Sequence, residues 1–166
     1  MSTYVKIETI NVGAGGASAI DFTAIPATYT DLYLKVSSRL SATDTPVSVK
    51  FNNSTSNVIW RRIYGAGSGS LTSQNGTDTY WFYSDTAAQT SLTYGFGEIY
   101  LPNYASSTYK SVSSQSFTEN NGTTAESFIA AALWSDNSAI NRITLTPLTG
   151  IFETYSTATL YGIKKN

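Results

Sequence analysis

The segment from Asp31 to Val36 constrains the fold of this chain more than any other. Leu32, Leu34 and Val36 alternate with polar or amphipathic residues, and a period of two is typical of a β-strand with one buried face. Such a strand needs hydrogen-bonded neighbours on both edges and a second apolar layer over its buried face. The rest of the chain must therefore supply these neighbours.

Short segments with alternating or aromatic residues recur along the whole chain, separated by residues that favour turns. They lie within residues 4–12, 18–23, 29–39, 47–51, 58–64, 79–84, 95–101, 108–117, 126–134, 140–146 and 157–163. A helix competes only at Ala130–Ala132, where the preceding Phe128-Ile129 favours a strand. We expect about ten short strands in one all-β domain over residues 1–166, an antiparallel two-sheet β-sandwich with a jelly-roll-like topology.

Local signals add four more specific predictions. The polar segment Asn52–Asn57 predicts a hairpin between residues 47–51 and 58–64, and Glu119–Gly122 predicts a second hairpin, because Asn-Gly suits a type I′ turn. Residues Gly65 to Asp78 are predicted to form a long exposed or interface loop. Tyr109 and Val112 would face opposite sides of a regular strand, and this change of side indicates a β-bulge.

The residue types that are absent exclude most catalytic chemistry. The chain has no cysteine and no histidine, so it lacks thiol nucleophiles, disulfides and the commonest general base and transition-metal ligand. Gly13–Gly16 has no lysine at the spacing of a phosphate-binding loop, and the acidic residues are scattered singly, without a pair typical of a glycosidase. We therefore expect no enzymatic activity and no cofactor.

Because the chain has no cysteine or histidine, calcium is the metal ion to consider. Aspartate and carbonyl groups in loops are its ordinary ligands. Four aspartates lie in predicted loops: Asp44, Asp78, Asp85 and Asp136. No EF-hand or repeated calcium loop accompanies them, and we expect no metal.

Charge and hydropathy also limit the partners. Charged residues make up 13% of the chain and the formal net charge is −1, so there is no electrostatic footprint for nucleic acid. The N-terminus has neither a basic nor an apolar signal region, and no run reaches the about 18 apolar residues of a membrane span. We expect synthesis in a cytoplasm and no membrane partner. A surface rich in hydroxyl groups suits contact with proteins or sugars.

Aromatic residues are the candidate contacts, and two interpretations apply to them. The rings fill the core and a subunit interface, or they form a platform on which sugars stack. We favour the first, because a domain of this size needs large apolar side chains inside. The candidate interface residues are Trp60, Tyr80, Trp81, Phe82, Tyr83 and Trp134.

Five segments together resemble a family of small virion proteins of tailed bacteriophages: residues 4–10, 20–26, 28–35, 49–53 and 156–163. Residues 65–93 are not part of the resemblance. It implies a β-sandwich, present in the virion as a homotrimer, that acts as a capsid decoration or cement protein. Its partners would be its own copies and the major capsid protein or another virion protein. The alternative is a receptor- or carbohydrate-binding tail fibre or tip protein. A third hypothesis, a glycan-cleaving enzyme, requires two carboxylates facing each other in a groove.

Overall fold

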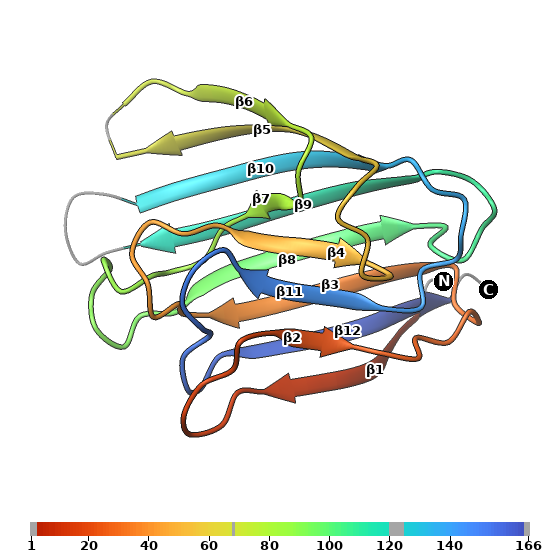
Figure 1. Ribbon diagram of the computed structural model, residues 1–166, viewed down its shortest axis with the longest axis horizontal. Helices are drawn as coiled ribbons and strands as arrows, with labels where there is room; N and C mark the ends of the chain where they lie inside the picture. Colours follow the sequence, from red (N-terminus) through yellow and green to blue (C-terminus); the bar gives the residue numbers. More distant parts are fainter. Residues whose placement is uncertain (1–2, 68, 120–124, 165–166) are drawn as a thin grey trace.

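The computed structural model describes residues 3–67, 69–119 and 125–164, and over these residues the chain forms twelve β-strands and no helix (Figure 1). All strand pairs are antiparallel and form two sheets, which confirms the predicted all-β sandwich. The strands are β1 (Thr3–Asn11), β2 (Ile20–Phe22), β3 (Asp31–Ser38), β4 (Val47–Phe51), β5 (Val58–Ala66), β6 (Thr72–Gly76), β7 (Tyr80–Phe82), β8 (Gly95–Pro102), β9 (Lys110–Glu119), β10 (Ala125–Trp134), β11 (Ile143–Pro147) and β12 (Thr157–Lys164).

The strand order is that of a jelly roll with two insertions. The larger sheet runs β1-β12-β3-β8-β9-β10-β5-β6 and the smaller one β2-β11-β4-β7. Eight strands form the nested pairs β1–β12, β2–β11, β3–β8 and β4–β7, which alternate between the two sheets. Nested pairs arise when one long hairpin folds over into two facing layers, as in the jelly roll. The predicted topology is therefore confirmed.

The two insertions widen the larger sheet. The hairpin β5–β6 lies between β4 and β7 in the chain, and the hairpin β9–β10 lies between β8 and β11. Because β5 pairs with β10, the two hairpins join into a four-stranded extension, β9-β10-β5-β6. In Figure 1, β10, β5 and β6 lie beyond the strands of the smaller sheet.

The hydrophobic core lies between the two sheets and includes the strand from which the fold was predicted. Leu32, Leu34 and Val36 are at most 2% exposed, and β3 is flanked by β12 and β8. The smaller sheet supplies the opposing layer, with Phe22 on β2 and Leu145 on β11 both fully buried. The alternation in β3 therefore predicted its buried face correctly.

Two predictions about connections are wrong. Residues 52–57 do not turn a hairpin, because β4 pairs with β11 and β7 in the smaller sheet whereas β5 pairs with β10 and β6 in the larger one. Asn52, Asn53 and Asn57 do adopt positive φ angles, so the turn signal was real but the chain crosses between sheets there. The predicted loop Gly65–Asp78 contains strand β6.

The register of β9 corrects a third prediction and confirms a fourth. Its pairing with β8 and β10 shows no register shift, and Tyr109 precedes the strand, so the predicted bulge is absent from β9. Register shifts occur instead between Lys6 and Glu8 in the β1–β12 pair and between Val47 and Ser48 in the β4–β7 pair. The β9–β10 hairpin is confirmed, whereas Asn121-Gly122 lies outside the described residues.

Candidate functional site: the outer face of the larger sheet

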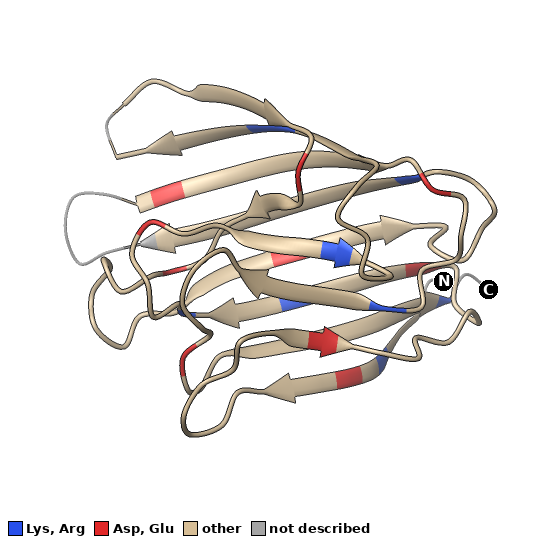
Figure 2. Ribbon diagram, viewed as in Figure 1, with Lys and Arg blue, Asp and Glu red and all other residues tan. Residues whose placement is uncertain are grey.

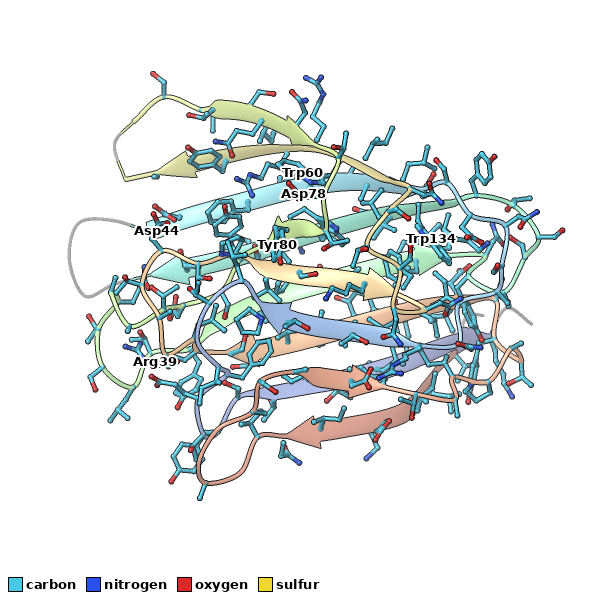
Figure 3. All side chains as sticks on the ribbon, viewed as in Figure 1. Arg39, Asp44, Trp60, Asp78, Tyr80 and Trp134 are labelled. Atoms are coloured by element: carbon cyan, nitrogen blue, oxygen red, sulfur yellow. The ribbon has the colours of Figure 1, made fainter. Side chains whose placement is uncertain are left out.

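Most of the aromatic residues predicted from the sequence lie in the core rather than on a surface. Trp60, Trp81, Phe82 and Trp134 are 1–9% exposed, which agrees with the core interpretation. The side chains of Trp81, Phe82 and Trp134 therefore present no surface to a partner. Tyr80 and Tyr83 are partly exposed. Figure 3 shows Trp60 beside Asp78, whose Oδ1 accepts a hydrogen bond from the indole N–H at 3.1 Å.

An aromatic cluster around Arg62 covers the inner side of the extension. The ring of Tyr83 stacks on Phe128 with centroids 4.5 Å apart, and Phe128 stacks on Tyr64 at 5.3 Å. The Arg62 guanidinium lies 4.4 Å from the Tyr83 ring and 4.9 Å from the Trp60 ring, within the range of cation–π attraction. These side chains take the place of the smaller sheet where the extension reaches beyond it.

The predicted calcium positions do not come together. Asp44 is exposed and Asp85 is buried. Asp78 accepts a hydrogen bond from the Tyr80 N–H at 2.9 Å. Asp136 accepts one from the Ser138 N–H at 2.7 Å, and this bond lowers the pKa of its carboxyl group. Among the described residues, no three acidic side chains gather into a group that would hold a metal ion. Figure 2 shows acidic and basic positions interspersed over both sheets.

The face of the larger sheet that is turned away from the smaller one, called the outer face below, exposes a row of large apolar side chains. Phe96 on β8 pairs with Phe117 on β9, with ring centroids 6.3 Å apart. Ile129 on β10 pairs with Ile63 on β5. These four side chains are 40–54% exposed, and we call them the apolar stripe. They occupy strand positions whose alternates point into the core.

A trough adjoins the apolar stripe on the outer face. Its first part is a hollow of about 210 Å³ bordered mainly by Tyr33, Glu98, Tyr100, Ser113 and Gln115. Its second part is a hollow of about 490 Å³ over β9, β10, β5 and β6, bordered by side chains that include Ile59, Arg61, Asn75, Ser111, Ala131 and Leu133. The two parts meet where Ser113 pairs with Ala131. Of the residues that border the two hollows, Trp60 was a sequence-based candidate and the others were not.

Hydrogen bonds fix the polar side chains of the first hollow. The Tyr33 hydroxyl donates to Glu98 Oε2 and the Gln115 amide donates to Glu98 Oε1. The Tyr100 hydroxyl donates to Asp31 Oδ2 at 2.8 Å. Burial, followed by the bond to Asp31, raises the pKa of Tyr100 to about 12, and burial followed by the bond to Glu98 raises the pKa of Tyr33 as well. Both phenols therefore remain protonated donors near neutral pH.

These raised pKa values predict a steep loss of stability in alkali. The unfolded chain releases tyrosine protons near pH 10, whereas folded Tyr33 and Tyr100 hold theirs to higher pH. Their contribution is complete below about pH 10 and is lost as the pH rises toward the folded pKa. A Tyr33→Phe/Tyr100→Phe variant should lose on the order of 1 kcal/mol less stability than the wild type between pH 10 and 12.

Thermal melting at closely spaced pH values measures this difference. Tyr109→Phe is the matched control, because Tyr109 is 62% exposed and precedes β9. The control should follow the wild-type alkaline curve. Identical curves for the double variant and the wild type would contradict the assignment of these two phenols.

No family model, curated protein or solved structure matches this chain. Within the described part of the chain, no helix has the length and apolar character needed to span a membrane. The apolar stripe and the trough are the two candidate binding surfaces of the outer face.

Proposed function

We propose that this protein is a non-catalytic structural component of a bacteriophage particle, a decoration or cement protein that binds other virion proteins through its apolar stripe. The observation that carries this proposal is the row of half-exposed Phe and Ile side chains on a sheet face that the described residues leave uncovered. Large exposed apolar patches are rare on soluble monomers and mark interaction sites. The resemblance of five sequence segments to phage virion proteins supports the location.

Burial of the apolar stripe would supply the binding energy. Each of its half-exposed side chains contributes about 1 kcal/mol when a partner covers it. That sum is offset by the entropy lost on association, so a single copy would bind weakly. Assembly as a homotrimer, as the family resemblance implies, would link three stripes and raise the overall affinity through effective concentration.

The bordering residues of the trough favour binding over turnover. Among the described residues that border it, Glu98 is the one carboxylate, and glycoside hydrolysis requires two that face each other across the scissile bond. Glu98 also accepts hydrogen bonds from Tyr33 and Gln115. This arrangement supports a non-catalytic role over the glycan-cleaving hypothesis.

Removal of apolar area from the stripe should weaken attachment to the particle. We expect a Phe96→Ser/Phe117→Ser variant to bind particles assembled without this protein about tenfold less tightly than the wild type. Co-sedimentation of each purified protein with such particles, at increasing protein concentration, gives the apparent Kd.

A matched control separates the stripe from general loss of apolar surface. Leu148 is 52% exposed and lies outside the larger sheet, so Leu148→Ser should bind as the wild type does. Melting curves establish that all three proteins are folded. Wild-type binding by the double serine variant, or no binding of the wild type to the particles, would refute this role.

A further inference from the structure

The trough follows from small side chains placed between larger ones on the outer face. Ser113 on β9 lies between Tyr100 on β8 and Ala131 on β10, and Ala131 in turn lies beside Arg61 on β5. The floor is therefore made of short side chains, with an aromatic ring at one end and a guanidinium at the other. A rigid sheet, rather than a loop, holds the polar groups in place.

The groups along the first hollow are oriented and still have hydrogen-bonding capacity. A carboxylate has about four acceptor positions, and an amide has two donor protons and two lone pairs. The bonds from Tyr33 and Gln115 use one position on each oxygen of Glu98. Both Glu98 and Gln115 can therefore accept hydrogen bonds from a ligand without losing the contacts that orient them.

The charge of the trough suits an uncharged ligand. Glu98 is its one carboxylate among the described bordering residues, and it lies opposite Lys35 in the β3–β8 register. An anion in the first hollow would be repelled by the carboxylate, whereas a hydroxyl group would donate to it. The exposed Arg61 lies at the far end of the trough.

The lining combines rings with polar groups. Tyr33 and Tyr100 are partly exposed, and Ile129 borders the same hollow. Sugar rings have apolar C–H faces and a rim of hydroxyl groups that both donate and accept hydrogen bonds. The first hollow, at about 210 Å³, is smaller than the roughly 300–1,000 Å³ of a drug-sized site, and the second extends it along the sheet. The shape therefore suits an elongated chain of sugar rings.

We propose that the trough binds a neutral oligosaccharide, with Glu98 and Gln115 accepting hydrogen bonds from its hydroxyl groups and Tyr100 contacting a ring face. This activity goes beyond the decoration role and does not rest on it. Phe96 and Phe117 lie two residues from Glu98 and Gln115 along β8 and β9, about 7 Å away, and Ile129 borders the first hollow. A partner that covers the apolar stripe would therefore lie beside the trough, so sugar binding is tested on the free protein.

A glycan array of neutral, sialylated and sulfated oligosaccharides is the first test, with the full-length protein as the probe. The neutral glycan that binds most strongly is then titrated calorimetrically into variants. Gln115→Ala removes an acceptor, and Ala131→Gln fills the trough floor. Each should weaken binding at least tenfold. Ser73→Gln is the matched control, because Ser73 is exposed on the outer face of β6 outside the trough.

The outcomes separate this inference from the proposed function. Loss of binding in both trough variants, with wild-type affinity in Ser73→Gln, supports the trough as the site. Absence of binding to every neutral glycan, binding to charged glycans alone, or wild-type affinity in both trough variants overturns it. Particle binding by the same proteins, measured separately, tests the decoration role without reference to sugars.

Discussion

Replacement of Trp81 by alanine should lower the free energy of unfolding by about 3–5 kcal/mol. Trp81 lies on β7, is 1% exposed and belongs to the hydrophobic core between the sheets. Truncation would leave a large cavity in an interior that relaxes only partly around it. Urea denaturation followed by circular dichroism measures the change directly.

Trp81→Phe is the matched control for this prediction. The Trp81 indole nitrogen has no hydrogen-bond partner among the described residues, so phenylalanine keeps most of the ring and removes a buried polar group. Its effect should be well below that of alanine. An alanine variant with wild-type stability that only failed to assemble would show that Trp81 is a contact residue and not part of the core.

Gly97→Ala should destabilise the protein by about 2–3 kcal/mol. A Cβ atom at Gly97 would lie 2.1 Å from Cζ and 2.5 Å from Cε2 of Phe82, and Phe82 is 1% exposed on the facing β7. A buried ring of this size cannot move away without disturbing the layer around it. Gly13→Ala is the control, because no atom lies within 4 Å of its added Cβ.

A double-mutant cycle tests the cause of the Gly97 effect. Phe82→Leu shortens the group that the new methyl meets, so the double variant should be more stable than the sum of the single effects by at least about 1 kcal/mol. Additive effects would place the clash elsewhere. Chemical denaturation of the four proteins completes the cycle.

The strands were predictable because a strand with one buried and one exposed face requires apolar and polar residues to alternate along the sequence. Val47–Phe51 was predicted with the bounds that β4 has in the structure, and the three core residues of β3 were placed on the correct face. Strand β6 was missed because it has only polar and glycine residues, so this edge strand shows no apolar alternation. Asparagines at positive φ mark a turn equally well in a hairpin and in a crossing between sheets.

The site was harder to predict because aromatic side chains favour cores and interfaces alike. In the run from Tyr80 to Tyr83, Trp81 and Phe82 are core residues and the two tyrosines are partly exposed. The apolar stripe lies on strands for which only the buried face was predicted. One signal was present: in β8 the apolar residue Phe96 shares its parity with Glu98, while the inward parity holds Gly97. Phe96 therefore falls on the same face as the charged Glu98, which predicts an exposed apolar position on the outer face.

The two borders of the larger sheet also bear on how this molecule avoids uncontrolled polymerisation. A long, regular border would template the addition of further strands and the growth of filaments. Strand β6 ends one side with five residues and only polar or glycine side chains, and β1 is interrupted on the other side by the irregularity between Lys6 and Glu8. Copies at high local concentration can therefore contact one another through their sheet faces without hydrogen bonding between their edge strands.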